Sequence, residues 1–99
     1  MNSPHFHPEA NAELTEAVHF YEQKSPGLGK ALAHTIESAL IMLGAHPEAA
    51  PKLRGRLRVK PINKFPYSLI YAFERNHLAI YAVMHQRQKP YYWLQRLKN

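Results

Sequence analysis

The sequence predicts an α+β fold, in which an N-terminal helical hairpin packs on a small antiparallel sheet with a short C-terminal helix. Two observations lead to this prediction. Apolar residues repeat with a helical period up to about residue 45, and they follow strand-like patterns from residue 56 to residue 85. A break rich in proline and glycine, residues 25–29, divides the helical part in two. The 99 residues have the size of one domain, so we expect a single domain over residues 1–99.

The first predicted helix runs from residue 9 to about residue 24. Its apolar side chains recur at intervals of three or four residues and form one stripe: Ala10, Leu14, Ala17, Val18 and Tyr21. Pro8 suits the entry of a helix, and the carboxylates of Glu9, Glu13 and Glu16 favour the positive end of its dipole.

A second predicted helix follows the break. Its apolar stripe contains Leu28, Leu32, Ile36, Ala39, Leu40 and Leu43. Gly44 and Pro47 predict where it ends. Two helices joined by so short a turn are expected to pack as an antiparallel hairpin.

The second half of the chain has the periods of strands. Residues 56–62 alternate, with Arg56, Arg58 and Lys60 on one face and Leu57 and Val59 on the other. Since the helices would cover one face of the sheet, we expect the cationic side chains, together with His85, on the opposite face.

Two apolar runs, residues 68–73 and 78–85, predict the central strands of a hairpin whose turn lies at residues 74–77. Tyr71 and Tyr81 lie deep in these runs, so we expect core positions with hydrogen-bonded hydroxyls. Residues 5–7 are expected to add a short strand. A short helix is expected after Pro90, with Tyr91, Leu94 and Leu97 on one side.

Charge divides the chain sharply. Residues 1–50 contain two basic and six acidic side chains, whereas residues 51–99 contain eleven basic side chains and the single acid Glu74. A net charge of +10 in one half favours a polyanionic partner, either nucleic acid or an acidic protein segment. The alternative is a solvated basic surface that serves solubility.

The basic half also contains the residue types that metal-free RNA cleavage requires. Arginine and lysine hold phosphates and stabilise a charged phosphorane, histidine can act as base or acid, and aromatic rings stack unpaired bases. The candidate cluster consists of Arg54, Arg56, Arg58, Lys60, Lys64, His85, Arg87, Tyr91, Tyr92 and Arg96. A structural reading is equally open, in which His85 is an ordinary polar residue at a strand end and Tyr91, Tyr92 and Trp93 pack the terminal helix.

Other classes of protein are poorly supported. The chain has no cysteine, no HExxH motif and no phosphate-binding glycine motif, so we expect neither a metal nor a cofactor. No apolar run approaches the ~18 residues that cross a bilayer, and no signal peptide is recognisable, so the expected location is the cytoplasm.

Three stretches together resemble the RelE/ParE superfamily of toxins from bacterial type II toxin–antitoxin modules. They are residues 14–47, "KFPYSLIY" at residues 64–71 and "LAIYAVMHQRQKPYYWLQR" at residues 78–96, so the resemblance covers nearly the whole chain. It implies a short first strand, a helical hairpin, an antiparallel sheet and a small C-terminal helix. It also implies a growth inhibitor that a cognate antitoxin wraps and neutralises.

The superfamily divides in function, and the resemblance leaves both branches open while favouring the ParE-like one. ParE-like members inhibit DNA gyrase by binding it and catalyse no reaction themselves. RelE-like members cleave mRNA on the ribosome, and for that branch the resemblance and the composition together give Arg58, Lys60, His85, Arg87 and Tyr92 as catalytic. A third alternative is a non-toxic basic module that binds nucleic acid or protein.

Two binding surfaces complete the expectations. The residues expected to bind the target or nucleic acid are Arg54, Arg56, Lys64, Lys89 and Arg96. The antitoxin is expected to bind part of the basic half together with the helical hairpin, where the expected residues are Leu14, Val18, Tyr21, Leu32 and Ile36.

Overall fold

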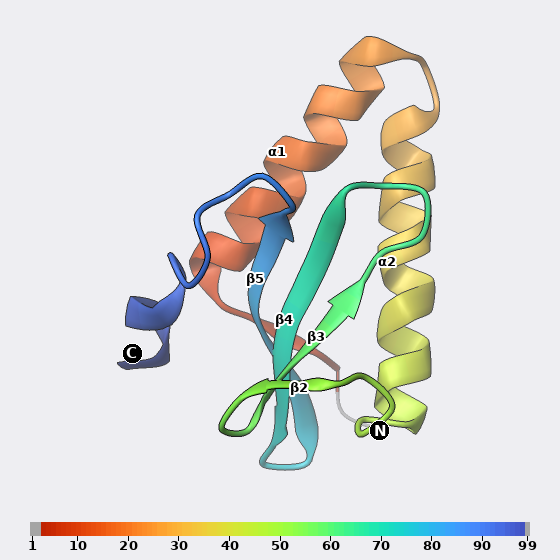
Figure 1. The fold of residues 1–99 in the computed structure, drawn as a ribbon. Helices are drawn as coiled ribbons and strands as arrows, with labels where there is room; N and C mark the ends of the chain where they lie inside the picture. The colour runs from red at the N-terminus through yellow and green to blue at the C-terminus, as the bar shows by residue number, and fades with distance from the viewer. Residues whose placement is uncertain (1–2, 99) are drawn as a thin grey trace.

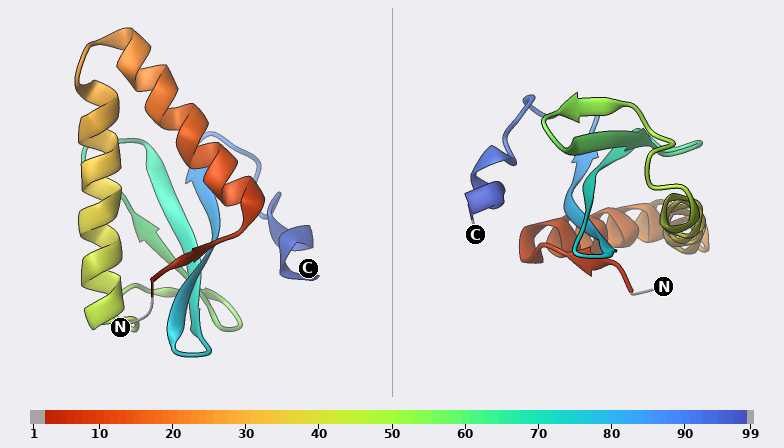
Figure 2. Two further views of the ribbon diagram at one scale, coloured as in Figure 1. Left: turned by 180° about the vertical axis from the view of Figure 1, so that it is seen from behind. Right: turned by 90° about the horizontal axis from the view of Figure 1, so that it is seen from below.

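A computed structural model describes residues 3–98 and confirms the predicted α+β class: two helices cover one face of a five-stranded sheet (Figures 1 and 2). The elements in chain order are β1 (His5–Phe6), α1 (Pro8–Lys24), α2 (Leu28–Ala45), β2 (Lys52–Arg54), β3 (Leu57–Pro61), β4 (Tyr67–Glu74), β5 (His77–His85) and the 3₁₀ helix η1 (Leu94–Lys98). The strand order is β1-β5-β4-β3-β2, and all neighbours are antiparallel except β1 and β5. No helix within residues 3–98 combines the length and apolar character that crossing a bilayer requires.

The helical hairpin is fixed at its tip by Glu22 and two glycines. The Glu22 carboxylate accepts hydrogen bonds from the backbone N–H groups of Gly27 and Gly29, at 2.8 and 3.0 Å, and thereby caps the start of α2. A Cβ atom on Gly29 would lie 2.4 Å from the carbonyl oxygen of Val18, so the helices approach this closely only because residue 29 has no side chain.

The predicted central hairpin is also confirmed. Arg75 and Asn76 connect β4 to β5, and both have positive φ angles, 51° and 65°, as a two-residue turn of type I′ requires. The register of β5 shifts at Tyr81, which lies between the partners of Ile70 and Tyr71 and forms a β-bulge. The strand β2, which follows Pro51, was not predicted: it has only three residues and pairs irregularly with β3.

Side chains from the two faces of the sheet form two separate cores. The first core lies between the helices and the sheet, and its fully buried members include Leu32, Ile36, Leu69, Tyr71 and Ile80. The second core lies on the opposite face, where Trp93 packs with Leu57, Ile70, Ala72 and Ala82. Both faces of β4 and β5 are therefore covered, as the continuous apolar runs predicted.

The expectation that Arg58 and Lys60 lie on the face opposite the helices is wrong. Leu57 and Val59 belong to the second core, so the alternation of β3 turns Arg58 and Lys60 to the helical side. The alternation was predicted correctly, but burial of both faces meant that the apolar residues of β3 did not have to face the helices.

The C-terminal part is helical, as predicted, but the helix is a single 3₁₀ element. Leu94 and Leu97 pack against the second core, whereas Tyr91 lies before the helix with φ 64° and is 42% exposed. Tyr71 is buried and Tyr81 is half-buried, and both hydroxyls are hydrogen-bonded as expected: Tyr71 donates to the Pro47 carbonyl at 2.9 Å, and Tyr81 donates to Glu74 at 2.7 Å.

Candidate functional site

The upper half of β5 lacks a strand neighbour on one side, and α1 supplies the missing partners. Strand β1 pairs only with Ala79 and Ile80, so the edge beyond the bulge is open. There the Glu13 carboxylate, half-buried on α1, accepts a hydrogen bond from the backbone N–H of Val83 at 2.9 Å. A carboxylate thus takes the place of a strand carbonyl at an edge that would otherwise stay unpaired.

Two side chains from the C-terminal segment, residues 86–98, complete this arrangement. The Arg96 guanidinium donates to both carboxylate oxygens of Glu13, at 3.0 and 2.8 Å, and to the carbonyl of Tyr81 at 3.0 Å. The Tyr92 hydroxyl donates to Glu13 at 2.7 Å. We call Glu13, Tyr92 and Arg96 the Glu13 cluster.

The environment of the Glu13 cluster fixes the protonation of its members. Burial, followed by the hydrogen bond to Glu13, raises the pKa of the Tyr92 hydroxyl far above its usual range. The hydrogen bond to Glu13 also raises the pKa of Arg96, whose side chain is only 5% exposed. Tyr92 therefore stays protonated, and the positive charge of Arg96 is neutralised by Glu13 within the fold. The cluster anchors the C-terminal segment and does not present these two groups to a target.

Immediately after β5, His85 organises a tight turn. The Nδ1 atom of its ring accepts a hydrogen bond from the backbone N–H of Arg87 at 3.0 Å. The backbone N–H of His85 donates to the side-chain oxygen of Gln88 at 3.1 Å. The Gln86 N–H donates to the Pro66 carbonyl at 2.9 Å, which ties the turn to the sheet. Arg87 and Lys89 are exposed on this turn.

A further exposed cation lies against the start of the C-terminal segment. The Arg54 guanidinium, on β2, lies 5.7 Å from the ring centroid of Tyr91. Both side chains are exposed, and within residues 3–98 no ion pair involves Arg54, Arg87 or Lys89.

Two other candidate cations form bonds within the fold. Arg58 donates to the carbonyl of Ala50 at 2.7 Å and holds the loop that follows α2. Arg56 pairs with Glu74 at 2.7 Å. Burial raises the pKa of Glu74, but the hydrogen bonds from Tyr81 and Arg56 outweigh it, so that the net pKa is lowered.

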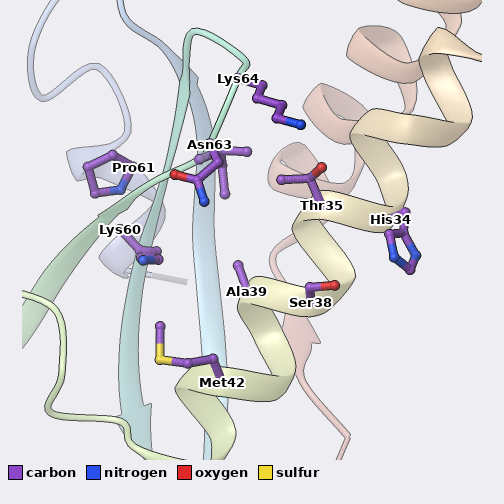
Figure 3. A pocket seen from close by; sticks show the side chains of 10 residues that line it. His34, Thr35, Ser38, Ala39, Met42, Lys60, Pro61, Asn63 and Lys64 are labelled. Atoms are coloured by element: carbon purple, nitrogen blue, oxygen red, sulfur yellow. The ribbon is translucent and has the colours of Figure 1, made fainter.

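Lys60 and Lys64 line a groove between α2 and the end of β3 (Figure 3). The groove has a volume of about 400 Å³ and is lined by His34, Thr35, Ser38, Ala39, Met42, Lys60, Pro61, Ile62, Asn63 and Lys64. We call it the α2 groove. As candidate binding residues, sequence analysis singled out only its two lysines; the signal for the rest was the group of polar residues His34, Thr35 and Ser38 on α2.

The structure does not bring the five candidate catalytic residues together. Lys60 lies in the α2 groove, whereas Arg58 binds the loop after α2. His85 stacks edge-on against Tyr67 and borders a different groove, which is lined by α1 residues and not by Lys60. Tyr92 is held by Glu13. Arg58 and Lys60 share one face of β3, and the backbone N–H of Arg87 donates to the His85 ring, but within residues 3–98 no hydrogen bond or ion pair joins these two pairs to each other.

The hairpin residues expected to bind an antitoxin have different environments. Leu14 and Val18 are half-buried and line a shallow groove between the outer sides of α1 and α2. Tyr21 packs edge-on against Phe65. Leu32 and Ile36 are 0% and 1% exposed in the first core, so they cannot touch a partner while this core is intact. Among residues 3–98, no group of three His, Cys, Asp or Glu side chains is placed to hold a metal ion.

Sequence analysis missed Glu13, which it assigned only to the helix dipole. The signal was its position: Glu13 lies three residues after Ala10 and four before Ala17, on the buried side of α1. A carboxylate there needs a partner, and the basic C-terminal segment could have been inferred to supply one.

Comparison with known proteins identifies the family. Residues 5–90 match the model of the family described as "ParE toxin of type II toxin-antitoxin system, parDE". No curated protein matches the chain.

Proposed function

Because this chain belongs to the ParE toxin family of type II toxin–antitoxin systems, we propose that it inhibits growth by binding DNA gyrase in the cytoplasm. A ParE toxin implies a cognate antitoxin, which neutralises it. The finer step, from family to gyrase, rests on the chemistry that the molecule can and cannot perform.

The scattering of the candidate catalytic residues carries this proposal. Metal-free RNA cleavage needs a base, an acid and cations around one phosphate. Here Tyr92 is bonded to Glu13, Arg58 is bonded to carbonyls, and Lys60 lies beneath α2. A protein that acts by binding needs no such convergence, so this arrangement supports a gyrase inhibitor over a ribonuclease.

We place the gyrase-binding surface on the exposed part of the C-terminal segment and its neighbour on β2. The turn after β5 holds Arg87 and Lys89 outward, and Arg54 and Tyr91 add a cation on an aromatic face. These charges are not used within the described fold, so they are available to an acidic surface of gyrase or of its DNA. Sequence analysis also expected Arg96 to bind the target, but we leave it out of this surface because its side chain is buried.

The test is a supercoiling assay with purified toxin and gyrase. The wild type is expected to block supercoiling. Arg87→Ala/Lys89→Ala is expected to weaken inhibition about tenfold, the loss of two interfacial charges. The matched control is Lys24→Ala/Lys30→Ala, which removes two exposed lysines at the tip of the helical hairpin and should inhibit like the wild type.

Two outcomes would replace the proposal. Full supercoiling at micromolar toxin, together with transcripts cut within codons, would indicate the ribosome-dependent endoribonuclease. Unchanged growth on induction without the antitoxin would indicate the non-toxic basic module.

We propose that the antitoxin contacts the outer side of the helical hairpin at Leu14 and Val18; Tyr21, whose ring packs against Phe65, does not line the groove there. Half-buried apolar side chains bordering a groove suit a partner's apolar face. The antitoxin encoded beside the toxin should co-purify with it, and substitution of Val18 by Asp should weaken that complex.

A further inference from the structure

The α2 groove differs in charge from three other grooves of the molecule. Its ten lining residues include two lysines and no acid. The groove beside β1 contains Glu74, the one at the end of β5 contains Glu13 and Glu16, and the one on the outer side of the hairpin contains Glu22. Within residues 3–98 neither Lys60 nor Lys64 forms an ion pair. Two ammonium groups therefore face this groove without a compensating carboxylate.

The turn between β3 and β4 directs the Lys64 side chain toward α2. Lys64 has φ 70°, the left-handed conformation of a turn residue. Figure 3 shows its side chain extending from this turn toward α2, where Thr35 lies.

The lining is amphipathic. Ala39 and Met42 on α2 provide an apolar side, as Figure 3 shows, and Lys60 and Lys64 face it from the sheet side. Ser38 and Asn63 can donate further hydrogen bonds. The groove therefore has one part that suits an apolar side chain and another that suits an oxyanion.

The chemistry of the lining favours a peptide over a nucleic acid. Single-stranded nucleic acids bind through bases stacked on aromatic faces, and no phenylalanine, tyrosine or tryptophan lines the groove. Apolar side chains in the floor suit the leucine or valine of a peptide instead.

The edge of β3 also limits how a peptide can bind. The backbone N–H of Val59 points away from β4 and donates to the carbonyl of Pro51. Two residues later the N–H on the same edge of β3 would belong to Pro61, which has none. A peptide therefore gains little by adding a strand here and binds through its side chains.

We propose that the α2 groove binds an acidic segment of the antitoxin, with carboxylates between Lys60 and Lys64 and an apolar side chain against Ala39 and Met42. This inference rests on the proposed toxin function and adds a second, electrostatic contact to the apolar one on the outer side of the hairpin. The groove lies on the sheet side of α2, so one antitoxin chain that reaches both sites would wrap around this helix.

The test is the affinity of the antitoxin encoded beside the toxin for two double variants of the full chain. Lys60→Gln/Lys64→Gln removes both charges from the groove. Lys52→Gln/Lys98→Gln removes two charges from exposed lysines that do not line it and so matches the change in net charge. We expect the groove variant to bind about tenfold more weakly or worse, with a smaller salt dependence, and the control to stay within about threefold of the wild type.

Each outcome has a distinct meaning. Equal affinities for the two variants overturn the groove assignment while the toxin function stands. An antitoxin that does not bind the wild type overturns the proposed function and this inference with it. If the groove variant instead loses affinity only for a single-stranded oligonucleotide, the groove binds nucleic acid and the acidic peptide is rejected. Unfolding curves for both variants establish that a loss of affinity is not a loss of fold.

Discussion

The Glu13 cluster and the α2 groove take their cations from the same basic half of the chain and use them in opposite ways. Arg96 is 5% exposed and bonded to both oxygens of Glu13, whereas Lys60 and Lys64 face a groove without an acid. In the cluster the charge is neutralised by folding. In the groove it remains for a partner to neutralise.

This difference shows that a net charge of +10 in residues 51–99 is not one surface. Arg56, Arg58 and Arg96 are bonded within the fold, and only part of the excess is left for binding. A cation's role here follows from whether the fold gives it an acid or a carbonyl. The predictions below separate the two kinds of cation, beginning with the largest expected effect.

The largest effect is expected for Arg96→Met. The substitution leaves the half-buried Glu13 beside the sheet without its counter-charge, and the cost should lie near the lower end of that for a broken buried pair, about 3 kcal/mol. The free energy of unfolding in urea measures it. Lys98→Met, which changes an exposed lysine of the same 3₁₀ helix, should stay within about 0.5 kcal/mol of the wild type. Equal losses for the two variants would mean that Arg96 is not the internal cation that we describe.

A smaller loss is expected for Tyr92→Phe. It removes one hydrogen bond to a charged group, worth about 1.5 kcal/mol, and leaves Arg96 in place. Because the fold raises the pKa of Tyr92, this hydroxyl stabilises the protein fully below its unfolded pKa of about 10, and the contribution declines progressively as the pH rises from there toward the higher pKa of the folded state. The stability gap between wild type and Tyr92→Phe should therefore narrow above about pH 10. Tyr91→Phe, at an exposed position, serves as control and should show no such gap.

How much of this arrangement the sequence could predict depends on the element. The hairpin, β3, β4, β5 and the Tyr71 and Tyr81 hydroxyl bonds followed from periodicity, because long elements average over many residues. The sheet face of Arg58 did not, since both faces of β4 are buried and either could have received Leu57 and Val59. The short strand β2 has too few residues to show a period.

The candidate site was predicted in composition and not in geometry. Residues His85 and Arg87 do adjoin, because they are close in sequence. The prediction that Arg58 and Lys60 meet Tyr92 concerned segments that are distant in sequence. It depended on which face of the sheet each side chain occupies and on its hydrogen-bond partners, and a pattern of charges determines neither. The α2 residues that line the groove and the carboxylate of Glu13 lie in the acidic half of the chain. They were missed because the sequence analysis looked for a cationic site in the basic half.

The smallest effect is expected at the ion pair of Arg56 and Glu74. Arg56 has an acidic partner, which the lysines of the α2 groove lack within the described fold, but it is far more exposed than Arg96. Its side chains are 59% and 26% exposed, so the pair should contribute less than about 1 kcal/mol. The fold lowers the pKa of Glu74, so its contribution is present above the unfolded pKa of about 4.3 and is lost as the pH falls below it. Glu74→Gln should be slightly less stable than the wild type at pH 7, and the difference should shrink by pH 3. A constant difference across this range would assign the effect to packing.

The most direct test of the division between internal and external cations is to measure stability and antitoxin affinity on one variant, Lys60→Gln/Lys64→Gln. Our account predicts an unfolding free energy within about 0.5 kcal/mol of the wild type, since neither lysine is paired within the described fold, together with an affinity about tenfold lower. A protein destabilised by more than about 1 kcal/mol with unchanged affinity would contradict it, because these lysines would then belong with Arg96.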